Sequence, residues 1–186
     1  YRHLKGGERF EPKEENPMLG FRGAFRYLQD QKMFEMELSA IKKVRDDGFK
    51  NIWFMVPFVR TPDELASVVR LLSAKGLRRS ELLKVWLMVE TPANVVLLEE
   101  FIKVGIDGLS IGTNDLTMLM LGVDRDNEKI ASLYDERNEA VMWAIERTIT
   151  LARKHNITTS ICGQLPSVYP EVIDDLIKWG ITSISV

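Results

Sequence analysis

Short apolar runs alternate with longer amphipathic segments along most of the chain. A continuous apolar run with polar residues at both ends is typical of a parallel strand that is buried on both faces. The predicted strands cover residues 51–59, 85–89, 108–112, 158–162 and 182–186. Because helical patterns separate these runs, the sequence predicts a series of parallel βα units.

Apolar residues at helical spacing fill most of the segments between the strands. At residues 61–64, for example, a threonine, a proline and two acids form a typical helix start. The predicted helices cover residues 21–47 with an interruption near Asp30, 61–74, 92–104, 135–155 and 170–179. Residues 1–20 and the long stretch after residue 112 are expected to be irregular.

This α/β alternation fits either an open doubly wound sheet or a closed barrel, and the right-handed crossover rule does not separate the two. Polar residues follow several strands at one end, which favours a (β/α)8 TIM-type barrel with its active site on the βα loops. Such a barrel has eight strands and typically about 250 residues. The chain has 186 residues. We therefore expect residues 1–186 to be one partial barrel domain with about the last five strands, the others preceding Tyr1.

The second and third predicted strands each lead into a carboxylate, Glu90 and Asp115 respectively. At the carboxyl ends of parallel strands both acids would face the same opening, where two carboxylates are suited to a hard cation such as Mg²⁺. The alternative is that each acid only caps the following helix. Beside Asp115, Asn114 offers an amide to a substrate, while Gly112 and Thr113 let the backbone approach a small ligand.

Two arginines and the single cysteine are further candidates. Arg22 lies in a turn that leads into a helix, and Arg125 lies between two aspartates. Arginine suits phosphate or carboxylate because its planar fork donates two parallel hydrogen bonds, although either residue could be an ordinary surface charge. Cys162 ends the fourth strand, so its thiol is expected at the same opening, where it could transfer a proton. The alternative for Cys162 is a buried structural role.

Composition limits the classes of partner. With 45% hydrophobic residues, 28% charged residues and a net charge of -2, the chain has no global positive field for nucleic acid or anionic membranes. No apolar stretch approaches the roughly 20 residues of a membrane helix, and no signal-peptide pattern stands at the start. One cysteine excludes an intrachain disulfide and fits a reducing compartment. We therefore expect a cytoplasmic protein.

Five short motifs occur in order along the chain. They are Asn-Pro-Met-Leu-Gly-Phe-Arg-Gly at 16–23, Val-Glu-Thr-Pro at 89–92, Gly-Thr-Asn-Asp-Leu-Thr at 112–117, Asp-Arg-Asp at 124–126 and Ile-Cys-Gly-Gln at 161–164. Each is weak by itself. In this order and spacing, over nearly the whole chain, they resemble the C-terminal barrel of the phosphoenolpyruvate (PEP)-utilising enzymes.

The resemblance implies Mg²⁺-dependent phosphoryl transfer from a phosphohistidine to the enolate of pyruvate, giving PEP. The implied roles are Mg²⁺ binding by Glu90 and Asp115, substrate contact by Gly112, Thr113, Asn114 and both acids, phosphoryl binding by Arg22 and Arg125, and proton exchange at the methyl carbon by Cys162.

The same resemblance implies partners: phosphohistidine and ATP-grasp domains in the same full-length chain, and a second copy in a homodimer. Residues 1–186 would then be inactive alone. The residue at position 164 distinguishes members of the family from one another: this chain has Gln164, whereas several members usually carry glutamate there. Two alternatives stay open: a related enzyme with another phosphate donor or acceptor, and a non-catalytic piece used for dimerisation.

Overall fold

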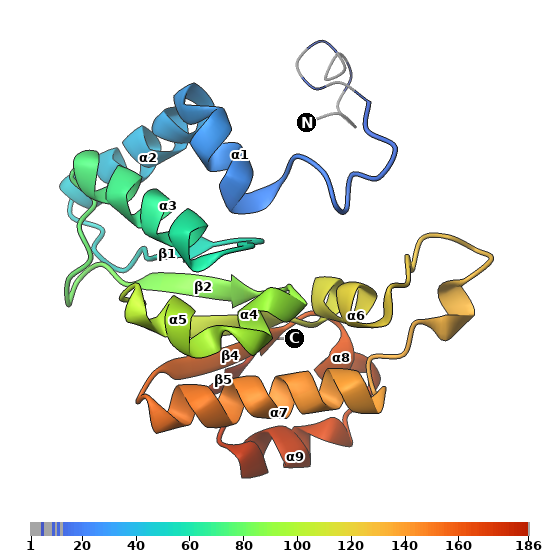
Figure 1. Ribbon diagram of the computed structural model, residues 1–186. Coiled ribbons are helices and arrows are strands. Elements are labelled where there is room, and N and C mark those ends of the chain that lie inside the picture. The colour runs from blue at the N-terminus through green and yellow to red at the C-terminus, as the bar shows by residue number, and fades with distance from the viewer. Residues whose placement is uncertain (1–4, 6–8, 10, 12, 186) are drawn as a thin grey trace.

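The computed structural model describes residues 5, 9, 11 and 13–185. In these residues one sheet of five parallel strands runs in chain order (Figure 1). The strands are β1 (Phe54–Val56), β2 (Val85–Val89), β3 (Gly108–Gly112), β4 (Thr158–Cys162) and β5 (Ser183–Ile184). A doubly wound sheet reverses its strand order at a switch point, whereas this sheet does not. The predicted α/β class and partial (β/α) barrel are confirmed.

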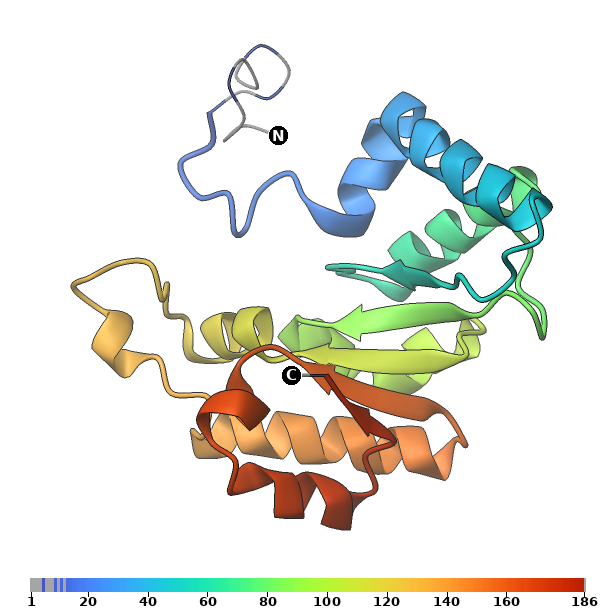
Figure 2. The same ribbon diagram turned by 180° about the vertical axis from the view of Figure 1, so that it is seen from behind.

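Helices precede and connect the strands (Figure 1). They are α1 (Gly23–Gln29), α2 (Gln31–Asp46), α3 (Pro62–Ala74), α4 (Pro92–Val96), α5 (Leu98–Lys103), α6 (Thr113–Leu121), the 3₁₀ turn η2 (Ala131–Leu133), α7 (Glu139–Lys154), α8 (Leu165–Val168) and α9 (Val172–Trp179). Most of them cover one face of the sheet, while α6 and the 3₁₀ turn after it lie beyond the strand ends (Figure 1); the view from behind shows the strands from the other side (Figure 2).

The helix predictions are correct where the start signals are strong. Thr61 caps α3, because its side-chain oxygen accepts a hydrogen bond from the Glu64 amide at 3.1 Å. The expected interruption at Asp30 separates α1 from α2. The helix predicted for 92–104 is broken at Leu97, and the one predicted from 135 begins only at Glu139.

The irregular stretch predicted after residue 112 is wrong at its start, where α6 follows β3 directly. The short helix α8 has no counterpart among the predictions, and β1 is shorter than expected. Residues 1–4, 6–8, 10, 12 and 186 lie outside the described residues. The predicted loop over 1–20 is therefore tested only in part, as is the end of the last predicted strand.

Alternate strand residues divide between the two faces of the sheet. In β2, Val85, Leu87 and Val89 are buried in the core, whereas Trp86 and Met88 are half-buried on the opposite face. Since successive side chains on a strand point to opposite faces, the core lies between the sheet and its helices. A functional site can therefore lie on the opposite face of the sheet or at the carboxyl ends of the strands.

Candidate functional site

Strands β2, β3 and β4 end almost level with one another. Val89 pairs with Ile111, and Gly112 pairs with Cys162. A pocket of about 160 Å³ lies at this edge, and its lining consists of Met88, Glu90, Gly112, Thr113, Asn114, Asp115, Arg125, Cys162 and Gly163. Every predicted site residue except Arg22 thus lines one pocket, to which the parallel register brings the strand ends and the segment after α6 brings Arg125. The chemical roles of these residues stay predictions.

Glu90 follows β2 and is half-buried at the pocket. Its Oε2 accepts a hydrogen bond from the Phe58 backbone amide at 2.7 Å. Burial raises the pKa of Glu90, the Phe58 amide lowers it in part, and the negative charge of Asp115 raises it further. Thr91, not Glu90, caps helix α4. A simple capping role for Glu90 is therefore wrong.

Asn94 holds the turn that carries Glu90. It is fully buried, and its Oδ1 accepts hydrogen bonds from the amides of Glu90 at 3.1 Å and Thr91 at 3.0 Å. Its Nδ2 donates to the carbonyl of Val59 at 2.8 Å, which ties the turn to the end of β1. The sequence prediction did not include Asn94, although Thr-Pro-Ala-Asn resembles a capping box, and such a pattern could have indicated it.

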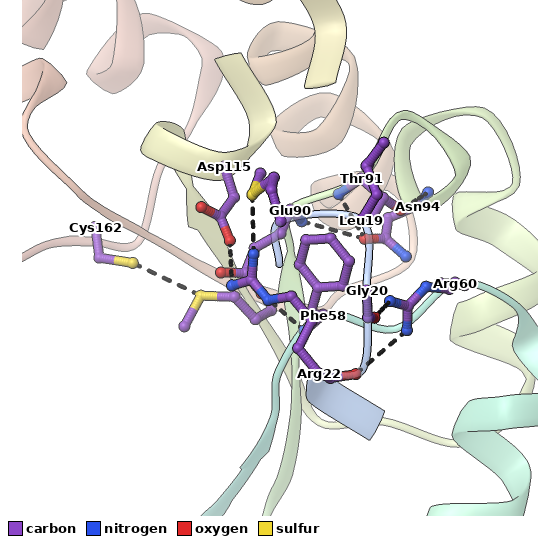
Figure 3. A network of polar contacts seen from close by, with 12 residues as sticks. Leu19, Gly20, Arg22, Phe58, Arg60, Glu90, Thr91, Asn94, Asp115 and Cys162 are labelled. Atoms are coloured by element: carbon purple, nitrogen blue, oxygen red, sulfur yellow. Dashed lines mark hydrogen bonds and ion pairs between the residues drawn. The ribbon is translucent and has the colours of Figure 1, made fainter. Parts of the chain in front are cut away.

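Arg22 joins the pocket through an ion pair. Its Nη2 donates to Oδ2 of Asp115 at 2.6 Å (Figure 3). Its Nη1 contacts the Met18 sulfur at 3.0 Å. The guanidinium carbon lies 4.0 Å from the centre of the Phe58 ring. Asp115 lies in the first turn of α6. Arg22 is therefore fixed at the site, and the alternative of an ordinary surface arginine does not describe it.

Arg60, which the sequence prediction did not include, holds the turn around Arg22. Its Nη2 donates to the carbonyl of Gly20 at 2.8 Å, and its Nη1 donates to the carbonyl of Arg22 at 3.3 Å (Figure 3). An arginine a few residues after a strand gives no sequence signal for this contact. The turn that positions Arg22 is thus tied to the segment that follows β1.

Thr113 is fully buried behind the pocket, and its hydroxyl donates to Oε1 of the buried Glu136 at 2.7 Å. Gly163 has a φ of +104°, and a Cβ at this position would lie 2.2 Å from the Thr113 hydroxyl oxygen. The Thr113 hydroxyl is therefore engaged inside the protein. The predicted substrate contact of Thr113 would therefore have to come from its backbone.

Arg125 and Asn114 line the pocket with polar groups that can face a ligand. Arg125 is half-buried. The Asn114 side-chain oxygen is buried, and no hydrogen-bond partner is found for it among the described residues. Burial and the charge of Glu136 raise the pKa of the nearby Tyr134 to about 12, against the opposing effect of Arg125. Tyr134 is therefore protonated and neutral at pH 7.

Cys162 contributes a half-buried thiol. The Ser110 hydroxyl donates to its sulfur at 3.5 Å, and the thiol itself contacts the Met88 sulfur at 3.7 Å. Its position at the end of β4, opposite Gly112 and in the pocket wall, separates it from the core. A purely buried structural role does not describe this thiol.

The residues present fit Mg²⁺. Within the described residues no cluster of three or more His, Cys, Asp or Glu side chains could form an all-protein metal site. Mg²⁺ commonly uses only one or two carboxylates and takes its other ligands from water and substrate oxygens. Glu90 and Asp115 are such a pair. Burial is the main cause of the raised Glu90 pKa and the negative charge of Asp115 adds to it, and a bound cation would relieve both effects. The unpartnered Asn114 oxygen lies in the same pocket wall.

Comparison with known proteins identifies the class of protein. Residues 1–186 match the family described as PEP-utilising enzyme, PEP-binding domain. The chain therefore belongs to the PEP-utilising enzymes, and the resemblance inferred from the motifs is confirmed.

Among the most similar relatives are three proteins named phosphoenolpyruvate synthase. That of Aeropyrum pernix is 50% identical over 192 residues, that of Aquifex aeolicus 48% over 190 residues and that of Escherichia coli 47% over 190 residues. Each alignment covers 100% of this chain but only 23%, 22% and 24% of the relative, respectively. The chain thus spans about a quarter of the length of these relatives. Among the helices that the structure describes, none is long and apolar enough to span a bilayer.

Proposed function

We propose that this chain is the PEP- and pyruvate-binding catalytic domain of a phosphoenolpyruvate synthase. In the full-length enzyme, ATP, pyruvate and water would give AMP, PEP and phosphate, with a phosphohistidine as the donor to pyruvate. The observation that carries the proposal is the single pocket that contains Glu90, Asp115, Asn114, Arg125 and Cys162. The names of the relatives support the same activity.

Formation of the enolate requires stabilisation of negative charge on the former carbonyl oxygen. Mg²⁺ bound by Glu90 and Asp115 would supply this stabilisation, and a metal at a developing oxyanion contributes several kcal/mol. The Asn114 side chain, which lines the pocket, would bind the pyruvate carboxylate or carbonyl by donating a hydrogen bond from its amide nitrogen. These three side chains would fix the plane of the substrate next to the thiol.

Cys162 is proposed to move the proton at the methyl carbon. As a thiolate it would take the proton, and the C–H electron pair would pass into the enolate. In the reverse direction the thiol would return the proton to carbon. Met88 and Ser110 hold the sulfur at the pocket. A thiol suits this step because it can accept a proton as the thiolate and return it as the thiol.

Arg22 and Arg125 are proposed to bind the phosphoryl group. The transition state of phosphoryl transfer is loose and carries charge on its peripheral oxygens. Guanidinium groups match these oxygens with several N–H donors in one plane. The phosphorus–nitrogen bond of the phosphohistidine would break as the enolate oxygen bonds to phosphorus.

The remaining proposals concern the full-length protein. Phosphohistidine and ATP-grasp domains would supply the phosphoryl group, and two copies would form a homodimer in the cytoplasm. A related enzyme with another phosphate donor or acceptor is the alternative. Gln164, which is exposed just beyond Cys162, and the names of the relatives both favour the synthase.

The direct test is a calorimetric titration of the full-length enzyme with oxalate, which resembles the enolate of pyruvate, with and without Mg²⁺. We expect Mg²⁺-dependent binding that is lost in Glu90→Gln. Glu81→Gln, which changes an exposed carboxylate outside the pocket, is the matched control and should bind normally. Binding that is independent of Mg²⁺, or equal in both variants, would contradict the proposal.

A further inference from the structure

Phe58 has an unusual backbone conformation directly beside the pocket. It follows β1, its side chain is only 3% exposed, and its φ is +42°. A bulky residue seldom adopts positive φ, and such a conformation persists only where surrounding contacts impose it. Residues of this kind concentrate at functional sites. The contacts that Phe58 makes therefore indicate what its conformation serves.

The turn that carries Arg22 packs directly on Phe58. Gly23 has a φ of +62°, and a Cβ on it would lie 2.5 Å from the Phe58 Cβ and 2.6 Å from the Phe58 carbonyl oxygen. The next amide, that of Ala24, donates to the carbonyl of Pro57 at 3.0 Å. Close backbone packing thus fixes the start of α1 relative to the end of β1.

Phe58 contacts two proposed ligand-binding side chains with two different groups (Figure 3). Its backbone amide donates to Oε2 of Glu90 at 2.7 Å, and its ring lies 4.0 Å from the guanidinium carbon of Arg22. The Arg60 guanidinium carbon also lies near this ring, at 4.9 Å. Phe58 therefore contacts both Glu90, a proposed metal ligand, and Arg22, which is proposed to bind the phosphoryl group.

We propose that Phe58 is a positioning residue for phosphoryl binding, whose ring supports the flat face of the Arg22 guanidinium while its amide holds the Glu90 carboxylate. The inference rests on the proposed function. A cation over an aromatic face is attracted by the ring quadrupole. The Arg22 guanidinium carbon lies over the Phe58 ring, and this contact occupies none of the N–H donors, so the donors that are not already bonded stay available to phosphoryl oxygens.

The ion pair with Asp115 strengthens this argument. Arg22 donates one N–H group to Asp115 and another to the sulfur of Met18. Either donor must be redirected if it is to reach a phosphoryl oxygen. The ring contact does not depend on the direction of these donors in the plane. Phe58 can therefore hold Arg22 at the pocket while its hydrogen-bond partners change.

The test compares two ligands on the full-length enzyme in the presence of Mg²⁺. PEP carries a phosphoryl group and should depend on Arg22, whereas oxalate has none and depends on Glu90 and Asp115. We expect Phe58→Leu to weaken PEP binding about tenfold, in line with the strength of cation–π contacts, and to change oxalate binding less than about twofold. Phe58→Tyr keeps the aromatic face and should bind both ligands nearly normally.

A double-mutant cycle with Arg22→Met separates positioning from general structural support. If Phe58 acts through Arg22, Phe58→Leu should cause no further loss of PEP affinity once Arg22 is replaced. Additive losses would overturn the inference, and so would an equal loss of both ligands in Phe58→Leu. If the unaltered enzyme bound neither PEP nor oxalate with Mg²⁺, the proposed function itself would fail instead.

Discussion

Gly112→Ala tests whether the position of the Glu90 side chain controls binding at this pocket. Gly112 has a φ of -88°, which any residue can adopt, so the substitution imposes no backbone strain. An alanine Cβ would lie 2.8 Å from Glu90 Cγ and 3.1 Å from its Oε1. Carbon atoms pack best at about 3.5–4.0 Å, so Glu90 must move by several tenths of an ångström or more. Its 2.7 Å hydrogen bond to the Phe58 amide would be lost or weakened.

The expected size of this effect follows from the cost of overpacking. Extra methyl groups in a tight site cost about 1–3 kcal/mol. In the free enzyme Glu90 escapes the overlap by moving, and the cost appears when Glu90 must return to its position to hold the metal. At about 1.4 kcal/mol for each factor of ten, Mg²⁺-dependent oxalate affinity should therefore fall roughly 5- to 150-fold. Isothermal titration calorimetry of the full-length enzyme measures this directly.

Gly108→Ala, at the other end of β3, is the matched control. Its Cβ would meet the Trp86 indole at 2.3 Å, so it should lower stability. Neither Gly108 nor Trp86 lines the pocket. Any Gly108→Ala enzyme that is folded should therefore keep its oxalate affinity. Unchanged affinity in a folded Gly112→Ala enzyme would refute the reasoning, because Glu90 could then move without consequence.

Three further predictions concern charge and buried hydrogen bonds. Burial raises the pKa of Glu90 above its ordinary 4.5 in the folded protein, so its contribution to stability is complete below pH 4.5 and is lost as pH rises through the raised pKa. Glu90→Gln should therefore raise the melting temperature of the metal-free enzyme at pH 7. A lower melting temperature would contradict the predicted direction of the Glu90 effect on stability. Thr113→Val leaves the buried Glu136 carboxylate without its hydroxyl donor and should cost about 1–3 kcal/mol by calorimetric melting, whereas Thr113→Ser keeps the donor and should cost less. Arg125→Lys should weaken PEP binding more than oxalate binding, and equal effects in titrations of both ligands would argue against phosphoryl contact.

The strands that the sequence predicts most accurately are those paired on both sides. The predicted ranges of β2, β3 and β4 agree with the structure, although only β3 is buried along its whole length and β2 and β4 alternate buried residues with more exposed ones. β1 lies at the edge of the sheet and pairs only over Phe54–Val56, and the chain turns at Phe58 soon afterwards. Which residues pair at an edge depends on the neighbouring strand, and the local pattern does not contain that information.

Helix α6 shows a different cause of error. Its residues include Leu116, Met118 and Met120, and apolar side chains occur on nearly all sides, so the amphipathic period that indicates a helix is weak. The helix ends at Gly122, which has a left-handed φ of +64°. A glycine directly after an apolar segment is a typical helix stop, and it was the available signal.

Most pocket residues could be predicted because their motifs end or directly follow the strands, but the residues that hold them in place could not. Glu136 stands between Asp135 and Arg137, a charged run typical of an exposed surface, yet it is only 3% exposed. Phe58 gives no signal, since an aromatic residue is an unexpected occupant of positive φ. Both owe their positions to contacts with segments distant in sequence.

Cys162 is proposed to exchange a proton with a three-carbon acid held at Glu90 and Asp115. The most direct measurement is proton NMR of pyruvate in deuterated buffer with the full-length enzyme and Mg²⁺. We predict that the methyl protons exchange with the unaltered enzyme, and that Cys162→Ala abolishes this exchange while ATP-dependent phosphorylation of the histidine domain continues. Exchange at the same rate in Cys162→Ala would contradict the account.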